Sequence, residues 1–370
     1  MVILSPLLPP ARGGLADHTH HLAATLARHR EVHVVTSPGA NASDTFRIHS
    51  GITDWRDAGA VRKAVESIPG SPTLLWQYVP HMYGRGGVNL AVPSLVEGFR
   101  RSGRRQVVIA HEIQAPLHWK PHWMAYAIWH RIAWKRIRRC ADAVGVSTEA
   151  WIERWRDSWT DIPGRDVFLV PSPSNFPVVP QPDDHRARWR ASLGLGPEVR
   201  VLAYFGTLSA AKQPDWVFAA WRSARAAGIP TALAVIGGRP EPKLEPGESD
   251  FYRPLGFLDA DQVSGALQAI DLLLLPFEDG VSERRTTITA GLAHGTPILT
   301  TRGHGTGSTL RSADFLRSTP AGDPTAFRDE AARLLAEPDR LRELSTKARQ
   351  AYAEAYSWDV VASRLLRRLP

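Results

Sequence analysis

The stretch FEDGVSERRTTITAGLAHGTPILTT, residues 277–301, decides how this chain folds. The apolar run DLLLLP at 271–276 leads into a polar loop at 278–285, and a helical pattern follows over 286–294. A turn at Gly295 then leads into a second apolar strand. Strand, loop, helix and strand in this order predict one parallel βαβ step. Ligands of open parallel sheets bind beyond the carboxyl ends of the strands, which is where the polar loop lies.

The polar loop carries the residue types of an anion site. Arg284 and Arg285 stand directly before the predicted helix, whose first residues are Thr286 and Thr287. The first N–H groups of a helix have no partner within it, and the positive end of the helix dipole lies there. Together with two guanidinium groups and two hydroxyls, these N–H groups predict a site for an anion, and phosphate matches it best.

The composition is that of a globular protein with two domains. The 370 residues are 43% hydrophobic and 22% charged, and a chain of this length forms two cores of ordinary size. The formal net charge of +8 favours an anionic partner, which is a phosphorylated ligand, a membrane surface or a nucleic acid. The sequence has no zinc-finger, helix-turn-helix, RRM or KH signature, so we expect no nucleic-acid partner.

The location expected from the sequence is the cytoplasm. Cys140 is the single cysteine, which excludes a disulfide framework and favours a reducing compartment. The N-terminal MVILSPLLPP is apolar, but prolines interrupt it and no basic leader precedes it. It therefore predicts a buried strand and no signal peptide. No apolar run approaches the length of a transmembrane helix.

The N-terminal half begins with a mononucleotide-binding type of pattern. A strand at 2–8, a turn at Gly13 and Gly14, a helix at 16–30 and a strand at 31–36 follow one another. The glycines do not fit the GxGxxG spacing of dinucleotide-binding loops. They either let the backbone approach a phosphate or simply form a tight turn, and the residues alone leave both interpretations open.

Two further strands of this half end in loops that carry histidine. The strand at 73–78 leads into the loop VPHMYGRGG with His81, and the strand at 106–110 ends in His111 and Glu112. A histidine at the carboxyl end of a buried strand is a candidate acid, base or sugar-binding group. The alternative is a histidine with a structural role.

Residues 118–139 predict a long amphipathic helix. Its apolar face comprises Trp123, Ala127, His130, Trp134 and Ile137, and a basic stripe beside that face comprises Arg131, Lys135 and Arg138. A basic helix that bears tryptophan can lie on an anionic membrane. It can also pack on a core with its basic face in solvent, which is the more usual arrangement.

The proline-rich stretch 171–184 predicts a linker, after which a second alternation of strands and helices begins. The strand at 199–206 ends in Gly206, and Lys212 stands between this strand and the next helix. Because glycine permits close approach of a ligand, Lys212 is a candidate phosphate ligand, the alternative being a solvated lysine. The two alternations predict two α/β domains with parallel sheets.

Two patterns that suggest a metal have better explanations. Asp259-Ala260-Asp261 precedes an alanine-rich helix, where capping accounts for the acidic residues. Of His18, His20 and His21, only the first and the last share a helix face, and the sequence places no third ligand beside them. We therefore expect no metal and no cofactor.

Several of these motifs resemble those of GT-B-fold glycosyltransferases related to the retaining family 4, the glycosyltransferase group 1 enzymes. GVSERRTTITAGLAHGTPILTT resembles their donor-binding loop and helix, and FGTLSAAK resembles their strand-loop motif. GGLADHTHHLA is similar to their first loop and helix, and the His111-Glu112 pair to their acceptor-side motif. The chain departs from the family pattern at two glutamates, where Ser282 and Ala290 stand, and at an arginine, where Thr207 stands.

The resemblance implies a GT-B fold, in which two Rossmann-like βαβ domains face each other across a cleft. It implies an acceptor-side domain at 1–176 and a nucleotide-sugar donor domain at 177–355. A C-terminal helix at 356–370, which opens with Ser357-Trp358-Asp359, is expected to cross back to the first domain, as in the family.

The resemblance, together with the chemistry above, assigns roles to the candidate residues. The donor-binding set comprises Gly13, Gly14, Gly206, Lys212, Phe257, Ser282, Glu283, Arg284, Arg285, Thr286 and Thr287. The acceptor-side set comprises Asp17, His81, His111 and Glu112. Within these sets we expect His111, Lys212 and Arg285 to be catalytic, Phe257 to contact the nucleotide base and Glu283 to contact sugar hydroxyls.

The implied activity is transfer of a sugar from a nucleotide-diphosphate sugar of the UDP or GDP type to an acceptor hydroxyl. Retention of anomeric configuration and independence of metal are expected from the resemblance. The acceptor is a glycan, a lipid or a small metabolite, and peripheral membrane contact through residues 118–139 is an open hypothesis. A nucleotide-sugar epimerase and a non-catalytic nucleotide-sugar binding protein of the same fold are the alternatives.

Overall fold

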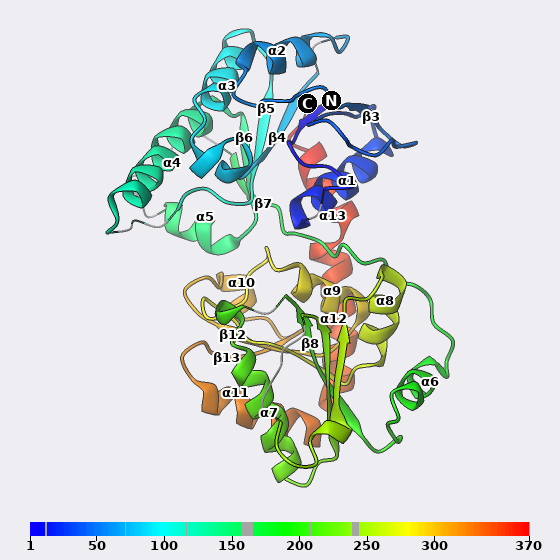
Figure 1. Ribbon diagram of the computed structural model, residues 1–370. Coiled ribbons are helices and arrows are strands. Elements are labelled where there is room, and N and C mark those ends of the chain that lie inside the picture. Colours follow the sequence, from blue (N-terminus) through cyan, green and yellow to red (C-terminus); the bar gives the residue numbers. More distant parts are fainter. Residues whose placement is uncertain are drawn as a thin grey trace. The chain divides into compact units, whose positions relative to one another are not determined.

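The computed structural model (Figure 1) describes residues 1–11, 13–70, 72–115, 117, 119–156, 166–207, 209–238 and 244–369. The chain forms two compact units. Unit 1 comprises Met1–Pro171 and Trp358–Pro370, and unit 2 comprises Ser172–Ser357.

Unit 1 is built on a parallel sheet whose described strands lie in the order β3-β2-β1-β4-β5-β6-β7. The strands are β1 (Val2–Leu4), β2 (His33–Val35), β3 (Arg47–His49), β4 (Leu74–Tyr78), β5 (Gln106–Ala110), β6 (Ala143–Val146) and β7 (Asp166–Leu169). The helices are α1 (Gly14–Ala27), α2 (Ala58–Glu66), η1 (Pro80–Met82), η2 (Arg85–Gly87), α3 (Ala91–Arg101), α4 (Pro121–Cys140), α5 (Glu149–Arg156) and the C-terminal α13 (Trp358–Leu366).

Helices cover both faces of this sheet, because successive strand residues point to opposite sides. In β1, Val2 and Leu4 pack in the core formed with α2, α3 and α4. Ile3, between them, packs in the second core with Leu22 of α1 and Leu365 of α13. Figure 1 shows α13, in red, beside α1, in blue, within this unit. The C-terminal helix thus buries its apolar side in the core of unit 1.

Unit 2 repeats the design with the strand order β10-β9-β8-β11-β12-β13, again parallel. The strands are β8 (Arg200–Gly206), β9 (Thr231–Gly237), β10 (Tyr252–Gly256), β11 (Leu272–Leu275), β12 (Ile298–Arg302) and β13 (Arg317–Pro320). The helices are α6 (His185–Ser192), η3 (Ala210–Lys212), α7 (Pro214–Ala226), η4 (Ser249–Phe251), α8 (Ala260–Ala269), α9 (Thr286–His294), α10 (Ser308–Arg311), α11 (Pro324–Ala336), α12 (Pro338–Ala351) and the π-helical turn η5 (Tyr352–Tyr356).

The two faces of this second sheet again have separate cores. Val201 and Ala203 of β8 pack with residues of α8 and α9, whereas Leu202 and Tyr204 pack with residues of α7 and α11. The strands are therefore apolar on both faces, as expected for a parallel sheet covered by helices on each side.

The predicted fold class of two parallel α/β domains is confirmed. The sequence analysis did not identify β3, α2 or α3, which are short elements between the motifs it used. The chain divides after Pro171, slightly earlier than the predicted 176, and the reason is local. The Ser172 N–H donates to the Glu283 carbonyl at 2.9 Å, and the Ser172 carbonyl accepts from Thr289 Oγ1 at 2.9 Å. Both partners belong to unit 2, so the first residue after the division is already bound to that unit.

No helix in the described ranges combines the length and the apolar character that crossing a bilayer requires.

Candidate functional site

The carboxyl end of β8 in unit 2 forms the base of the candidate site. Gly206 has φ +128°, and a Cβ there would lie 3.0 Å from Nζ of Lys212 and 3.3 Å from Cγ2 of Thr287. The strand end, the lysine and the helix start that the sequence predicted to meet therefore do so. Lys212 Nζ donates to Thr207 Oγ1 at 3.2 Å. Gln213, the next residue, has φ +43°, a left-handed conformation that residues other than glycine rarely adopt.

Arg284 and Arg285 lie in the loop between β11 and α9, where a carboxylate that the sequence analysis missed pairs with both. Arg284 Nη2 lies 3.1 Å from Asp279 Oδ2, and Arg285 Nη2 lies 2.5 Å from Asp279 Oδ1. The Arg285 guanidinium also lies 4.4 Å from the centre of the Phe277 ring, which favours a cation over its face. Arg285 is therefore held in place before any ligand binds.

The first turn of α9 is open to a ligand. The residue before it, Arg285, makes no side-chain hydrogen bond that caps the helix. The N–H groups of Thr286 and Thr287 are among those that a helix leaves without internal partners. Their side chains are half-buried, so they line the site from the helix side.

The electrostatics of this loop favour an anion. Burial, and then the positive charge of Arg285, lowers the pKa of the Lys212 ammonium. Burial also lowers the pKa of Arg285, against the opposing effect of Asp279. Nε of Arg285 has no hydrogen-bond partner in the part of the chain that the structure describes. Lys212 and Arg285 are thus two cations held close together, beside N–H groups that lack acceptors within the described residues. Such a site would bind a phosphate or pyrophosphate.

Three other residues of the predicted donor-binding set differ widely in exposure. Ser282 is buried, and Glu283 is only 1% exposed. Phe257, in the loop after β10, is 83% exposed. An exposed aromatic ring at the carboxyl edge of the sheet is available to a ligand, whereas the side chains of Ser282 and Glu283 are covered by the protein.

A second loop, which the sequence analysis did not identify, packs against Asp279. The Gly305 N–H donates to the Asp279 carbonyl at 2.7 Å. A Cβ on Gly280, whose φ is +88°, would lie 2.2 Å from the Gly303 nitrogen. The glycine-rich loop after β12 therefore packs directly on the Asp279-Gly280 turn. Its only sequence signal is Gly303-His304-Gly305 after a strand.

The prediction that Asp259 caps a helix is confirmed. The Gln262 N–H donates to Asp259 Oδ1 at 2.8 Å, and the Asp259 N–H donates to Gln262 Oε1 at 3.1 Å, which together form a capping box at the start of α8. Within the described residues, no group of three or more His, Cys, Asp or Glu side chains is arranged to bind a metal.

In unit 1 the predicted residues gather at the carboxyl edge of its sheet. α1 begins at Gly14, after Gly13 with φ +141°, and a Cβ on either glycine would meet no atom within 4 Å. Within the described residues, this backbone is therefore open to a ligand. Asp17 lies half-buried in the first turn of α1.

His111, directly after β5, belongs to a partly buried polar cluster with α1. Its Nε2 lies 2.6 Å from Oε1 of Gln77 in β4, and its ring centre lies 4.6 Å from that of His18. Burial lowers the pKa of His111 to about 4 and that of His18 well below its ordinary value. Both imidazoles are therefore neutral at pH 7. His18, which the sequence analysis considered for a metal, packs against Trp358 of α13.

The other acceptor-side candidates are exposed. Glu112 follows His111 at the surface. His81, in η1, has its ring centre 5.1 Å from that of His130 in α4, and His130 Nε2 lies 3.0 Å from the Gly86 carbonyl. His81 therefore borders a loop that α4 holds in place.

The predicted helix at 118–139 is α4, with its first residue, His118, outside the described residues. The burial of Ala127, Trp134 and Ile137 agrees with a core-packing face. The predicted basic stripe is wrong at Arg138, which is only 2% exposed, because that position turns toward the core beside Ile137. Trp123 also differs, since it lies exposed at the surface.

The comparisons with known proteins agree with this architecture. Residues 199–337 match the family described as glycosyl transferases group 1. The D-inositol 3-phosphate glycosyltransferase of Segniliparus rotundus is 29% identical over 217 residues, which are 54% of this chain and 47% of that protein. The chain spans less than half the length of the curated relatives it matches.

Solved structures resemble the whole chain. Sucrose-phosphate synthase from Thermosynechococcus elongatus has a TM-score of 0.70 at 17% identity, over 99% of this chain and 97% of the other. HepE from Anabaena in complex with UDP-glucose has a TM-score of 0.67 at 12% identity, over 99% and 98%. Identities this low establish the fold alone. Residues 199–337 thus form a domain of the group 1 glycosyltransferase family, and the two units of the chain have the GT-B fold of glycosyltransferases.

Proposed function

We propose that this protein is a glycosyltransferase that moves a sugar from a nucleotide-diphosphate sugar, of the UDP or GDP type, to an acceptor hydroxyl. The observation that carries the proposal is the meeting of Lys212, Arg285 and the uncapped start of α9 at Gly206. The complexes of HepE with UDP and with UDP-glucose have this fold and support a donor of the UDP type.

The chemistry proposed for unit 2 is stabilisation of the leaving group. As the bond between the anomeric carbon and the β-phosphate oxygen breaks, negative charge grows on the pyrophosphate, and the acceptor oxygen forms the new bond to carbon. Lys212, Arg285 and the N–H groups of Thr286 and Thr287 bind that charge. Donors fixed in advance need no rearrangement as the charge develops. Asp279 and Phe277 hold Arg285 in position.

The proposed clamp supplies positive charge from side chains and a helix end, so the reaction needs no metal. Transfer with retention of anomeric configuration is part of the proposal and rests on the similarity to group 1 enzymes. We place the protein in the cytoplasm. In unit 1, the neutral His111 imidazole is proposed to form a hydrogen bond with a sugar hydroxyl, because at pH 7 it carries no positive charge.

Incubation with a panel of nucleotide sugars, with EDTA present, tests the proposal. Release of UDP or GDP that depends on an added acceptor, with an α-linked product from an α-linked donor by NMR, is the expected result. Arg285→Ala is expected to abolish it. Conversion of the donor to its sugar isomer would instead identify an epimerase, and binding without turnover of any donor would identify a binding protein.

A peripheral membrane contact through α4 is a separate proposal. Ile128 and Ile132 are each 48% exposed, and Trp119, before the helix, is 82% exposed. Lys135 continues the same exposed face one turn further on. Apolar side chains at the surface beside a basic one are the pattern of a helix that lies on an anionic bilayer.

Sedimentation with vesicles tests this contact. We expect binding to vesicles of phosphatidylcholine with phosphatidylglycerol and much weaker binding to phosphatidylcholine alone. Ile128→Ser with Ile132→Ser should release the protein, whereas Val178→Ser, which changes an equally exposed apolar residue of unit 2, should not. Equal sedimentation of both variants would remove the α4 surface from the proposal.

A further inference from the structure

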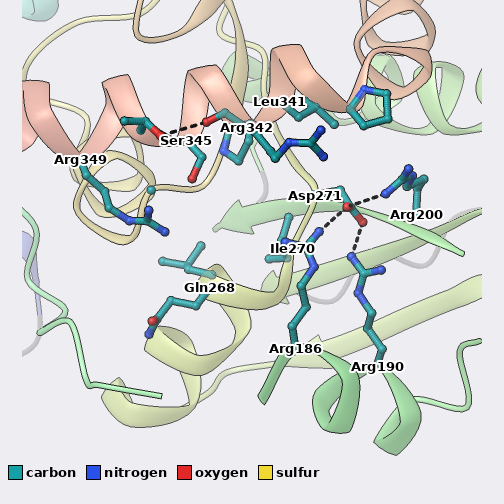
Figure 2. Close-up of a pocket in the computed structure, with 15 residues that line it drawn as sticks. Arg186, Arg190, Arg200, Gln268, Ile270, Asp271, Leu341, Arg342, Ser345 and Arg349 are labelled. Carbon is teal, nitrogen blue, oxygen red and sulfur yellow. Dashed lines mark hydrogen bonds and ion pairs between the residues drawn. The ribbon is translucent and has the colours of Figure 1, made fainter. Parts of the chain in front are cut away.

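A second basic pocket, drawn in Figure 2, lies in unit 2. It is at the opposite end of the sheet from the donor loop. Its volume is about 490 Å³, and its charged lining residues are Arg186, Arg190, Arg200, Arg342, Arg349 and Asp271. Asp271 directly precedes β11, and Arg200 begins β8. The pocket therefore lies at the amino ends of these strands, whereas Gly206 and the Arg284-Arg285 loop lie at their carboxyl ends. A strand such as β8 separates the two sites by roughly 20 Å.

On one side of this pocket, a single carboxylate, that of Asp271, interacts with three arginines. Asp271 is 2% exposed. It accepts a hydrogen bond from Arg186, another from Arg190 at 2.5 Å, and lies 3.6 Å from Nη1 of Arg200. The Val201 N–H donates to the same carboxylate at 2.7 Å. A single negative charge opposes three positive ones, so this side of the pocket keeps an excess of positive charge and of N–H donors.

Part of this positive charge is buried, because the guanidinium group of Arg190 lies inside the protein. Its side chain is 7% exposed, and its Nε has no hydrogen-bond partner in the described ranges. Burial lowers the pKa of Arg190 despite the adjacent Asp271. A buried guanidinium that lacks a partner for one donor is energetically unfavourable unless a further acceptor is supplied.

The opposite wall is the helix α12, and it adds two more guanidinium groups. Figure 2 shows Arg342 and Arg349 reaching from α12, with Ser345 between them. Arg342 pairs with Asp339, one turn earlier on the exposed side of the helix. Among the described residues Arg349 makes no ion pair, and it lies over Gly295, where a Cβ would be 2.4 Å from its Nε. Part of its role is favourable contact with the carboxyl end of α9.

The chemistry of the lining selects the ligand. Five arginines and one aspartate give the charged lining a net charge of +4, and Ser345 and Thr346 add hydroxyl groups. Guanidinium groups bind phosphate oxygens in pairs. Leu267, Ile270 and Leu341 provide apolar surface for a small organic group. We propose that this pocket is a second anion site, independent of the donor site, that binds a small phosphate compound such as a pyrophosphate or a phosphate monoester.

The test uses inorganic pyrophosphate as the probe, with the donor site disabled. In a Lys212→Ala/Arg285→Ala background, calorimetry should still detect pyrophosphate binding. Adding Arg342→Gln and Arg349→Gln should weaken it at least tenfold. Both arginines are on the exposed helix surface, so the buried Asp271 cluster stays intact. Arg340→Gln is the matched control, because Arg340 lies on the same helix, pairs with Glu343 and does not line the pocket.

The outcomes separate this proposal from the donor site. Absence of binding in the donor-disabled background, or equal affinity with and without Arg342→Gln and Arg349→Gln, would overturn it. UDP binding in the Arg342→Gln/Arg349→Gln protein should be unchanged, and that measurement reports on the donor site alone. A lipid phosphate has the same chemistry, so vesicles of phosphatidylcholine with phosphatidic acid provide a parallel arm. Binding that the two substitutions remove supports the site in either arm and identifies its source.

Discussion

Lys212→Met is expected to slow the reaction and, at the same time, to stabilise the free protein. Burial and the charge of Arg285 lower the pKa of the Lys212 ammonium. A lowered pKa of a basic group means that the folded state disfavours its charged form. At neutral pH, removal of that charge therefore raises the free energy of unfolding. The hydrogen bond lost with it, to Thr207 at 3.2 Å, lies at the surface and contributes little.

The loss of activity follows from the position of the ammonium group. Nζ lies against Gly206 and within reach of the start of α9, where the departing pyrophosphate is proposed to bind. One charged donor to a developing negative charge contributes ~3 kcal/mol in the transition state, which is a factor of about 100 in kcat. A solvent-exposed ion pair of a lysine elsewhere on the surface, by contrast, contributes at most about 1 kcal/mol, and it does so to folding stability and not to the transition state. Methionine has nearly the length of lysine, so packing beside Gly206 is retained.

Lys347→Met is the matched control. Lys347 lies 2.7 Å from Asp314 and 2.8 Å from Glu343, and these partners raise its pKa. Its replacement should lower Tm slightly and leave kcat unchanged. Initial rates with the preferred donor and melting curves of both variants are the measurements. A Lys212→Met enzyme with kcat within about twofold of the parent, or with both kcat and Tm reduced, would refute the reasoning.

Three further outcomes are expected. Gly206→Ala should lower both Tm and kcat, because a Cβ at φ +128° is strained and lies 3.0 Å from Lys212 Nζ; melting curves and initial rates check this. The free energy of unfolding should fall as the pH falls from 6.5 toward 4, because the unfolded chain protonates His111 in this window and the folded chain does not. With a folded pKa of about 4 the effect is about 3 kcal/mol. Denaturant titrations at several pH values should show that the free energy of unfolding of His111→Gln depends less steeply on pH. Asp259→Ala should lower stability by about 1 kcal/mol through loss of the capping box with Gln262, with kcat unchanged, whereas a drop in kcat that added metal restores would contradict the capping role.

The parts of the candidate site that could be predicted are those with a local signal. Gly206, Lys212 and the start of α9 each follow a strand or precede a helix within a few residues, and parallel strands bring all such points to one edge of the sheet. Asp279 was not predicted, because the residues next to it in the sequence give no signal of its role. It is one of several polar residues in the loop, and its role appears only when Arg284, Arg285 and the Gly303 loop are placed around it.

The same reasoning explains why the second basic pocket is invisible in the sequence. Arg186 and Asp271 are 85 residues apart, and Arg349 comes from a third region of the chain. Pairing over such separations follows no helix or strand period, so a sequence pattern cannot report it. Both ends of the 271–279 stretch carry an aspartate that binds several arginines, one before β11 and one after it. Since both clusters consist of an aspartate and several arginines, their composition does not distinguish them, and only their positions at opposite ends of the sheet do. The carboxyl end has glycine at the strand terminus and an open helix start, which suit a reacting diphosphate. The amino end is lined by five arginines, which suit a ligand that is held and not transformed.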